Sequence, residues 1–428
     1  MRHALFVTFQ YPPDASSSGV LRTLKYTRYL ADHGWRVTVL SVASSAYETV
    51  DEATLADIPP TVRVVRTPYL DTRKQLAVRG RYLARTALPD RFVGWLPWAV
   101  AAGLRIARAD PVDLVYSTSP PATAHLIAWR LSRRLRKPWV ADFRDPWFED
   151  PPEPGAPAGK LFRAIDRRLE AGVVKAARHI VASTESLRDQ LAARYPKLDG
   201  TKFGFIPNGY DEADFANVVP DESATATGNA PARECMSIVH AGSINPDFRD
   251  PMPLVHALAR ARDQGLLEPH RIRLRFLGGG PHAESPALQR ALADSGLAEI
   301  VQMLPRLPYA QALAELARAD VLLLQASEDT RALVPAKLYE YLRMRKPVLA
   351  LTLPGESSAL LARTGGGLVV DPADGEALAQ AVAGLYRHWQ GGTLGTVCAD
   401  QALLARYDRS ALAGQLATTF ETAIGSGP

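Results

Sequence analysis

The sequence predicts an α/β fold of two units, each a doubly wound parallel sheet covered by helices. Short apolar segments of strand length alternate with helical segments in both halves of the chain, which is the pattern of successive βαβ units. Between the halves, residues 216–234 are rich in Ala, Thr, Pro and Gly and have no apolar periodicity, as expected of a linker. The length of 428 residues is sufficient for two domains with full cores.

The first half contains a series of segments with the composition of buried strands. The first, HALFVTF, leads through a loop into a helix predicted over residues 20–33, and Gly34 is the signal that ends this helix. The later strand segments are WRVTVLSV, VRVVRTPY, VDLVYSTS, PWVADF and HIVAST. In a doubly wound sheet the loops at the carboxyl ends of the strands carry the chemistry, so the functional residues are expected in those loops.

The second half repeats this pattern. Its strand segments are MSIVHAGS, IRLRFLGGG, IVQMLP, ADVLLLQAS, PVLALT and GLVVDP. In the last helix of the chain, Leu412, Leu416 and Phe420 recur at helical spacing. This apolar stripe predicts that the last helix packs back on the first unit.

The predicted domain organisation follows from these two series. We expect an N-terminal domain of residues 1–215, completed by the helix within 409–428, and a C-terminal domain of residues 235–408, joined by the linker at 216–234. Two similar α/β units predict a deep cleft between them, which is the usual place for a small-molecule site.

Charge and cysteine content limit the class of partner and the compartment. The net charge of +5 suits acidic partners such as nucleic acid, an anionic membrane or phosphorylated small molecules. The charges are dispersed and form no zinc-finger, RNA-binding or helix-turn-helix signature, so nucleic acid is not expected as a partner. Cys235 and Cys398 share no disulfide or metal-binding spacing. The chain begins with a strand rather than a signal peptide, so we expect a cytoplasmic protein.

Residues 89–109, PDRFVGWLPWAVAAGLRIARA, form the most membrane-like segment. The apolar run is shorter than the ~20 residues of a membrane span, and Pro97 interrupts it. One interpretation is a helix of the core or of the domain surface. The other is an interfacial segment with tryptophans at the level of lipid headgroups and arginines on the polar side. The residues of that second interpretation are Trp95, Trp98, Arg91, Arg105 and Arg108.

Two glycine-containing loops follow predicted strands. In YPPDASSSGVLR, Gly19 and the serines allow backbone amides to approach an anion at a helix N-terminus; the alternative is a plain loop with serine caps. The glycines of GGGP, residues 278–281, are expected to form a tight turn. Neither loop is a G-x-G-x-x-G motif, which argues against a dinucleotide-dependent oxidoreductase.

Charged residues follow other predicted strands. Arg249, in HAGSINPDFRDP, either clamps a diphosphate by forked hydrogen bonds or is a surface arginine. In VADFRDPW, Asp142 and Asp145 either act as base or sugar-hydroxyl acceptor, or cap the next turn. Asp142 directly follows the strand and is favoured as the cleft residue. His125 falls in an apolar helix and is interpreted as a core histidine.

The segment ALVPAKLYEYL predicts a helix that binds an anion at its N-terminus. Pro335 fits the first turn, and the amides of Ala336 and Lys337 together with the Lys337 ammonium form the site. Glu340 lies one to two turns further and can accept hydrogen bonds from two adjacent hydroxyls, as a ribose offers. The alternative is an internal ion pair of Glu340 with Lys337 or Arg343.

Taken together, these segments resemble family 4 of the retaining glycosyltransferases. The resemblance covers nearly the whole chain, and the order and separation of the motifs make it far more specific than any one of them. It is nearest to the bacterial branch that makes cell-surface polysaccharides. The segments that carry it are YPPD…SGVLRTLKYTRYLADHGWRVTVLS, DLVYSTSPP, VADFRDPW, IPNGYDEADF, HAGSI…FRDP…L, LRFLGGGP, ADVLLLQAS and PAKLYEYLRMRKPVLALT.

The resemblance implies a GT-B fold, with two Rossmann-like domains facing each other across a deep cleft. It implies transfer of a hexosyl or deoxyhexosyl group from a UDP-, dTDP- or GDP-linked sugar to a growing glycan or a lipid-linked acceptor. No metal ion or other cofactor is expected, since a positive clamp replaces the metal. Peripheral contact with the cytoplasmic face of the inner membrane fits a lipid-linked acceptor.

The resemblance also assigns roles to residues of this chain. Arg249 and Lys337 would neutralise the diphosphate, and Glu340 would hold the ribose hydroxyls. The Gly19 loop would approach the donor phosphates and the acceptor. The backbone of residues 333–336 would face the sugar and phosphates. The remaining assignments from the resemblance are Val334 and Ala336 within that backbone and Leu304 beside the nucleobase. Asp142 and Asp145 are the catalytic candidates because of their place after the strand. The departing diphosphate oxygen would deprotonate the acceptor.

The sequence departs from the family at Ala332. Members of the family often have Glu, seven residues, then Glu; here the second acid is Glu340 and the first is absent. Glu328 or Asp329 could substitute, or the donor could be a deoxysugar with fewer hydroxyls, and the departure weakens the inference of retained stereochemistry. A nucleotide-sugar epimerase of the same fold and a non-catalytic nucleotide-sugar binding protein remain as alternatives.

Overall fold

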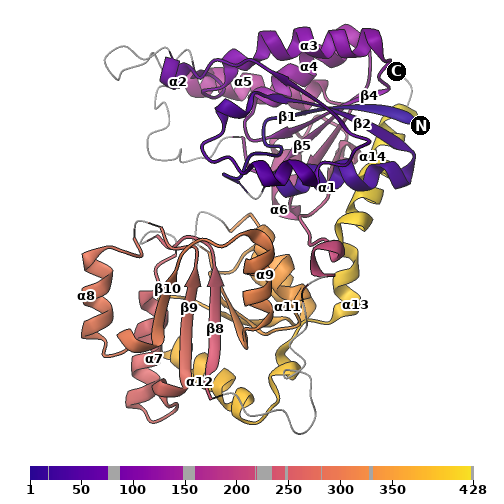
Figure 1. Ribbon diagram of the computed structural model, residues 1–428. Helices are drawn as coiled ribbons and strands as arrows, with labels where there is room; N and C mark the ends of the chain where they lie inside the picture. Colours follow the sequence, from indigo (N-terminus) through magenta and orange to yellow (C-terminus); the bar gives the residue numbers. More distant parts are fainter. Residues whose placement is uncertain are drawn as a thin grey trace. The chain divides into compact units, whose positions relative to one another are not determined.

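The computed structural model describes residues 1–17, 19–75, 87–147, 160–216, 218, 234–245, 249–280, 282–326 and 331–425. Contacts divide the chain into two compact units, Met1–Asn208 with Arg409–Pro428 and Gly209–Asp408 (Figure 1). The division falls at Asn208, whereas the predicted boundary was at residue 215. Most of the predicted linker, at 217 and 219–233, lies outside the described residues.

The first unit is built on a seven-stranded parallel sheet in the order β3-β2-β1-β4-β5-β6-β7. Every strand segment predicted in the first half forms a strand of this sheet, and the three-residue strand β7 was not predicted. The strands are β1 (Arg2–Thr8), β2 (Trp35–Val42), β3 (Arg63–Thr67), β4 (Leu114–Ser119), β5 (Trp139–Phe143), β6 (His179–Ala182) and β7 (Phe203–Phe205).

Helices cover both faces of this sheet. Helix α1 continues as a 3₁₀ turn, η1 (Leu30–His33), up to the predicted end at Gly34. The helices are α1 (Gly19–Tyr29), α2 (Thr72–Gln75), α3 (Leu96–Ala109), α4 (Thr123–Leu135), α5 (Lys160–Ala176), α6 (Glu185–Arg194) and α14 (Arg409–Gly425). Figure 1 shows α3, α4 and α5 on one face and α1 and α14 on the other.

The last helix, α14, belongs to the core of the first unit. The ring of Phe420 is fully buried and lies 5.1 Å from the ring of Trp35 and 5.7 Å from that of Tyr116, centroid to centroid. Leu412 and Leu416 are buried in the same cluster. The apolar stripe of α14 therefore covers a sheet face whose strands lie far earlier in the chain, and Phe420 contributes its aromatic ring to that contact.

The segment 89–109 contains a 3₁₀ turn at Val93–Trp95 and then the whole of α3. Pro97 lies in the first turn of the helix, where its missing amide is tolerated, so it does not interrupt the helix. Trp95 is fully buried and donates from its indole nitrogen to the hydroxyl of Thr67 at 2.7 Å. For Trp95 the interfacial interpretation is therefore wrong and the core interpretation holds, because its ring completes the core. Trp98, in contrast, is 40% exposed. Among the described residues, no helix is both long and apolar enough to cross a membrane.

The second unit is built on a six-stranded parallel sheet in the order β10-β9-β8-β11-β12-β13. Each strand segment predicted in the second half forms one of its strands, so the predicted α/β class is confirmed for both units. The strands are β8 (Met236–Ala241), β9 (Ile272–Leu277), β10 (Val301–Leu304), β11 (Val321–Gln325), β12 (Val348–Leu351) and β13 (Gly367–Val370).

Alternate residues of these strands face two separate cores. Helices α7, α8 and α12 contribute to one core, and α9, α10 and α11 contribute to the other. The helices are α7 (Met252–Asp263), α8 (Pro286–Asp294), α9 (Tyr309–Ala317), α10 (Ala336–Arg343), α11 (Glu356–Thr364), α12 (Gly375–Gln390) and α13 (Gln401–Leu404).

The strand orders place a topological switch point in each sheet. In the first unit the order reverses between β1 and β4, and in the second between β8 and β11. In open α/β sheets, ligands bind beyond the carboxyl ends of the strands at such points. The loops after β1 and β4, and those after β8 and β11, are therefore the places where this fold positions a site.

Candidate active site

Two side chains tie helix α10 to the carboxyl end of strand β8. The ammonium of Lys337 donates a hydrogen bond to the carbonyl oxygen of Ala241 at 2.6 Å. One turn further along α10, the hydroxyl of Tyr341 accepts from the amide of Ala241 at 2.9 Å. The last residue of β8 is therefore bonded through both of its backbone groups to α10, and the first turn of that helix is held at the switch point.

Lys337 is a buried cation that lies near a second cation. Burial, and then the charge of Arg249, lower the pKa of Lys337 to about 7, while the charge of Glu340 opposes this shift. The backbone of Arg249 pairs with that of Asn245 through amide–carbonyl bonds of 2.8 and 3.3 Å. Its guanidinium lies 3.5 Å from the hydroxyl oxygen of Ser243. The end of β8 therefore carries excess positive charge, which favours a bound anion.

The glycines after β9 form the tight turn that the sequence predicted, and they bring two strand ends together. Gly278 has a φ of +135°, a conformation that side chains disfavour. A Cβ added there would lie 2.7 Å from the carbonyl carbon of Gly242, just beyond β8. The amide of Gly278 donates to the carbonyl of Leu304, the last residue of β10, at 3.1 Å. The ends of β8, β9 and β10 thus form one backbone surface. Pro281 lies outside the described residues.

His240 is a buried polar residue in β8 that was assigned no role from the sequence. Its Nδ1 lies 3.0 Å from the carbonyl oxygen of Leu323, and its Nε2 has no hydrogen-bond partner among the described residues. Burial, and then the charge of Lys337, lower the pKa of His240 to about 3, so the ring is neutral. Because a carbonyl only accepts, Nδ1 carries the proton and Nε2 presents a lone pair.

The His240 lone pair and the Lys337 ammonium approach the same point. A Cβ added at Gly242 would lie 3.4 Å from Nε2 of His240 and 2.6 Å from Nζ of Lys337. An acceptor and a cation therefore lie on the side of Gly242 to which a Cβ would point, next to the region where the positive charge favours an anion. The apolar run that forms β8 hides this histidine in the sequence.

Glu340 is only 8% exposed, and it has a hydrogen-bond donor nearby in the fold. The hydroxyl of Tyr309, the first residue of α9, donates to Oε1 of Glu340 at 2.8 Å. Tyr309 is itself 40% exposed, so this edge of the carboxylate lies near the surface of the unit. Arg343, one of the two partners considered for Glu340, instead donates from Nε to Glu212 at 2.7 Å.

The loop that enters α10 is held by the N-terminus of α11. The amide of Glu356 donates to the carbonyl of Arg331 at 2.8 Å. Val334 is 7% exposed and its side chain packs into the core, so the backbone is the part of this residue that can face a ligand. Pro335 stands at the N-cap and Ala336 begins the helix. The loop backbone, including Ala332, is thereby fixed beside the first turn of α10.

In the first unit, Gly19 begins α1 and lies against a buried guanidinium. A Cβ added at Gly19 would lie 1.8 Å from Nη1 of Arg144 and 2.4 Å from Oε1 of Gln10. Arg144 is held there by hydrogen bonds from Nε to the carbonyl of Ser119 and from Nη2 to that of Pro120, both 2.9 Å. The glycine therefore makes room for Arg144 at this switch point. Arg144 was not among the predicted site residues, although it stands between the two candidate aspartates.

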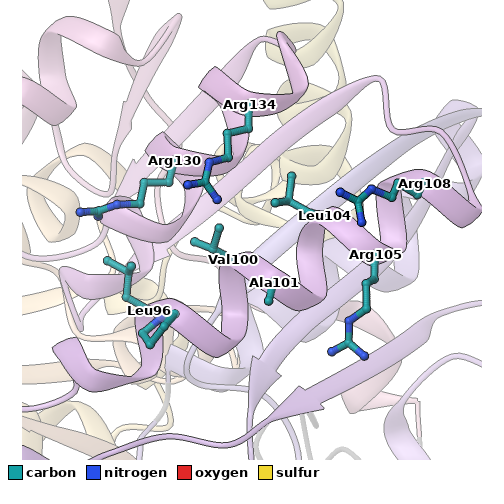
Figure 2. A pocket seen from close by; sticks show the side chains of 9 residues that line it. Leu96, Val100, Ala101, Leu104, Arg105, Arg108, Arg130 and Arg134 are labelled. Atoms are coloured by element: carbon teal, nitrogen blue, oxygen red, sulfur yellow. The ribbon is translucent and has the colours of Figure 1, made fainter.

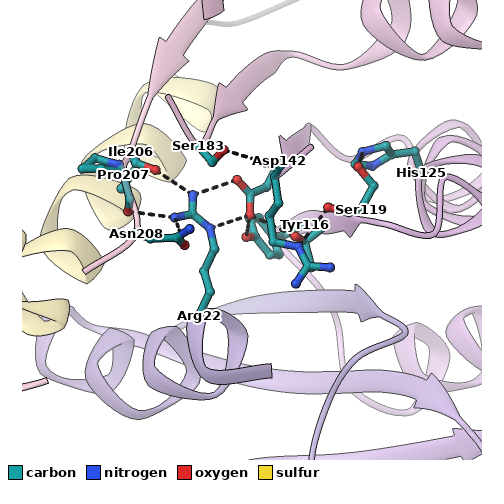
Figure 3. Close-up of polar contacts among 11 residues, drawn as sticks. Arg22, Tyr116, Ser119, His125, Asp142, Ser183, Ile206, Pro207 and Asn208 are labelled. Atoms are coloured by element: carbon teal, nitrogen blue, oxygen red, sulfur yellow. Dashed lines mark hydrogen bonds and ion pairs between the residues drawn. The ribbon is translucent and has the colours of Figure 1, made fainter. Parts of the chain in front are cut away.

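Asp142 is fully buried and forms an ion pair with Arg22 (Figure 3). Nε and Nη2 of Arg22 donate to its two carboxylate oxygens at 3.0 and 2.9 Å. The hydroxyl of Tyr116 donates to the same carboxylate at 2.6 Å. Burial opposes ionisation of Asp142, but the charge and hydrogen bonds of Arg22 outweigh it and lower the pKa.

The expectation that Asp142 faces a ligand cleft is therefore corrected, because its side chain is enclosed in the core. The same guanidinium of Arg22 also donates to the carbonyls of Ile206 and Pro207, each at 2.8 Å. The ion pair thus joins α1, β5 and the segment after β7, which explains a charge at the end of an apolar strand.

Asp145 and His125 have different environments. Asp145 is partly exposed, and burial raises the pKa of its carboxyl although the charge of Arg144 opposes the shift. His125 is a core histidine, as predicted. Its ring nitrogens lie 2.8 Å from the hydroxyl of Ser117 and 2.9 Å from that of Ser119, and burial lowers its pKa to about 3. Asp145 is therefore the one of the two candidate aspartates that retains access to solvent.

Two family models match the chain in succession. The Glycosyl transferase 4-like domain matches residues 19–209, and the Glycosyl transferases group 1 domain matches residues 236–388. The chain belongs to the GT-B glycosyltransferases. A comparison of the sequence with curated proteins finds no match.

Solved structures with the fold of this glycosyltransferase match it over its whole length. A glycosyltransferase from Rickettsia africae is 14% identical, with a TM-score of 0.66 and coverage of 100% of both chains. Alr3699/HepE from Anabaena, in complex with UDP, is 17% identical, with a TM-score of 0.65 and coverage of 99% of this chain and 100% of that chain. Sucrose-phosphate synthase from Thermosynechococcus elongatus is 16% identical, with a TM-score of 0.63 and coverage of 100% of both. At these identities the likeness shows the fold alone.

Within the second unit of this glycosyltransferase, the fold brings most of the predicted donor residues to one sheet edge. Lys337 and Glu340 lie on α10, the charge of Arg249 acts on Lys337, and Leu304 is bonded to the glycine turn beside them. Gly19 lies in the first unit. Glu328 and Asp329, considered as substitutes for the acid missing at Ala332, lie outside the described residues.

Proposed function

We propose that this glycosyltransferase moves a hexosyl or deoxyhexosyl group from a nucleoside-diphosphate sugar to a glycan or lipid-linked acceptor in cell-surface polysaccharide synthesis. The observation that carries the proposal is the pair of cations, Lys337 and Arg249, at the switch point of the second sheet. A diphosphate there neutralises both charges and restores the full ionisation of Lys337. Structures of Alr3699/HepE with UDP and with UDP-glucose support a nucleotide-sugar donor, and UDP-, dTDP- and GDP-linked sugars share the diphosphate.

The remaining donor contacts follow from the same edge of the sheet. Glu340 accepts hydrogen bonds from the two ribose hydroxyls, and its bond from Tyr309 fixes the carboxylate in place. The nucleobase lies beside Leu304, and the loop backbone at Val334 and Ala336 faces the sugar and the phosphates. This arrangement uses one side chain for the ribose and leaves the sugar to backbone groups.

In the reaction, the bond between the anomeric carbon and the diphosphate oxygen breaks, and a bond to the acceptor oxygen forms with retained stereochemistry. The acceptor proton passes to the departing diphosphate oxygen. Arg249 and Lys337 stabilise the negative charge that develops on that leaving group, which is the role a metal ion has in other transferases. Asp145 has a raised pKa that suits transient contact with an acceptor hydroxyl.

Ala332 gives this donor site its particular character. The methyl side chain makes no hydrogen bond to a sugar hydroxyl, whereas a glutamate there would. A donor that lacks a hydroxyl, such as a deoxysugar, leaves no polar group unpaired at this position. We therefore expect a nucleoside-diphosphate deoxysugar to be used in preference to the fully hydroxylated sugar.

Three single variants test the donor site: R249A, K337A and E340A. Each should lower the rate of sugar transfer by roughly a hundredfold or more, because each removes a charge or hydrogen bond directed at the donor. R260A is the matched control, since Arg260 pairs with Glu376 on the surface of the same unit at 3.3 Å and surface ion pairs contribute little. Transfer rates equal to the wild type in all three variants would refute the assignment of the donor site.

Two further measurements separate this proposal from the alternatives. Transfer that persists in excess EDTA supports the positive clamp, and loss of transfer restored by a divalent cation contradicts it. Conversion of the donor sugar to its epimer without any acceptor would indicate an epimerase. Stoichiometric binding of UDP with no turnover of any donor would indicate a binding protein. A thermal-shift panel of nucleoside diphosphates and nucleotide sugars identifies the base, since ligand at 100 times its Kd stabilises by about 2.7 kcal/mol.

A further inference from the structure

A groove with a volume of about 580 Å³ lies between helices α3 and α4 on the first unit (Figure 2). Its floor is apolar and includes Leu96, Val100 and Leu104 from α3. Four arginines line its sides, and Figure 2 shows two on each helix. They are Arg105 and Arg108 on α3, and Arg130 and Arg134 on α4. The groove is remote in sequence from every residue assigned to the donor.

These arginines form no ion pair with a carboxylate in the part of the chain that the structure describes. Helices α3 and α4 contain no Asp or Glu. The acids at their ends have other partners: Asp110 pairs with Arg36, and Asp90 accepts from the amide of Thr123 at 2.7 Å. Arg130 and Arg134 are four residues apart, so they repel each other on one side of α4. All four arginines are exposed, so solvent and salt screen part of this repulsion, and an anionic surface that binds from outside would reduce it further.

Apolar groups beside the arginines indicate the kind of anion. Trp98 is 40% exposed, and it lies seven residues before Arg105 and hence on the same side of α3. Tryptophan with arginine beside an apolar floor suits the boundary between lipid headgroups and acyl chains. A free phosphate or a nucleic acid backbone would use the charges but would leave Trp98 and the leucines in water.

We propose that the α3–α4 groove is a docking site for an anionic bilayer surface, with headgroup phosphates between the arginines and Trp98 inserted at the interface. This role goes beyond sugar transfer and can be measured without it. The proposed surface differs in its residues from the interfacial segment considered in the sequence. Trp95 and Arg91 do not belong to it, because Trp95 is in the core and Arg91 pairs with Glu48 at 2.8 Å. Arg105 and Arg108 of that interpretation remain, and α4 adds Arg130 and Arg134, which were not among its residues.

The test is co-sedimentation of the full chain with vesicles that contain phosphatidylglycerol, compared with vesicles of phosphatidylcholine alone. The wild type should bind the anionic vesicles and not the neutral ones. R130Q/R134Q should weaken binding by roughly 30-fold, since each arginine near the surface contributes about fivefold. W98S should weaken binding to the same vesicles without changing its dependence on salt. Raising the salt concentration should weaken wild-type binding more than that of R130Q/R134Q.

The matched control is R290Q/R387Q, which removes two exposed arginines from α8 and α12 of the second unit. It lowers the net charge equally and should bind the vesicles as the wild type does. Equal losses in both double variants, or equal wild-type binding to both vesicle types, would overturn the proposal.

Tighter binding of a single-stranded oligonucleotide than of the vesicles, abolished by R130Q/R134Q and not by W98S, would assign the groove to nucleic acid instead. Thermal unfolding midpoints identify any variant that fails to fold, and R105Q/R108Q then serves as the replacement. Because no donor or acceptor is present, failure here leaves the transferase proposal untouched.

Discussion

Raising the pH above 7 should weaken binding of UDP by removing the charge of Lys337. Burial and the charge of Arg249 hold the pKa of this ammonium at about 7 in the free protein. A bound diphosphate places negative charge beside the ammonium and raises its pKa, so binding takes up a proton. The affinity should therefore fall by up to tenfold for each pH unit above about 7, or about 1.4 kcal/mol per unit. Below that pH the ammonium is already charged, and its contribution to the pH dependence disappears.

Isothermal titration calorimetry with UDP measures this coupling directly. Titrations in two buffers of different ionisation enthalpy give the number of protons taken up. Lys337 should contribute about half a proton at pH 7 and about nine tenths at pH 8. The terminal phosphate of UDP titrates near pH 6 and contributes little above pH 7.

Two variants at the same position separate Lys337 from other titrating groups. K337R keeps a cation that does not deprotonate in this range, so its affinity should not fall above pH 7. K337M should bind weakly at every pH and show no proton uptake between about pH 7 and 9. A wild-type affinity that stays constant across this range, or a K337M variant with the wild-type slope, would refute the proposed role of the ammonium.

Further predictions concern the packing that positions the sites. G278A should lower the free energy of unfolding by more than about 3 kcal/mol, because it combines a strained φ with a contact of 2.7 Å to the backbone. G265A, with a φ of +70° and no atom within 4 Å, should cost only about 1–2 kcal/mol in the same urea titrations. D142N should destabilise by about 3–5 kcal/mol by leaving Arg22 unpaired in the core. Since the pKa of Asp142 is lowered, its stabilisation is present above about pH 4 and is lost as the pH falls through the folded pKa, and urea titrations of D142N should lack this loss. F420A should destabilise the first unit by about 3–5 kcal/mol, and an unchanged urea midpoint would contradict the packing of α14.

The sheets could be predicted because parallel strands are buried on both faces and are therefore continuous apolar runs. The segment WRVTVLSV matches β2 (Trp35–Val42) residue for residue. Strand β7 (Phe203–Phe205) was missed because three residues at the edge of a sheet give no such run. Pro97 was interpreted as an interruption, although a proline in the first turn of a helix is compatible with its start.

The proposed anion-binding turn at Lys337 is a local feature, so the sequence predicts it: a proline, two backbone amides of the first helical turn and a lysine are close together in the chain. The partners of these residues are not local. Tyr309, the donor to Glu340, comes from a different helix, and the unpaired Nε2 of His240 is hidden in an apolar strand. Local spacing contains no information about such neighbours.

The order of residues along the chain was enough to determine the α/β class, the family and the cationic character of the proposed donor site. Each of these depends on local composition or on motifs within one loop and helix. Whether a charged or aromatic residue serves a ligand or the core was decided only by the tertiary structure. Asp142 was expected in a cleft, and one of the two interpretations placed Trp95 at a membrane interface, yet both side chains are enclosed. Arg130 and Arg134 were assigned no role from the sequence and line an open groove. The physical reason is that burial and ion pairing depend on distant segments, as when Arg22 of α1 satisfies Asp142 at the end of β5.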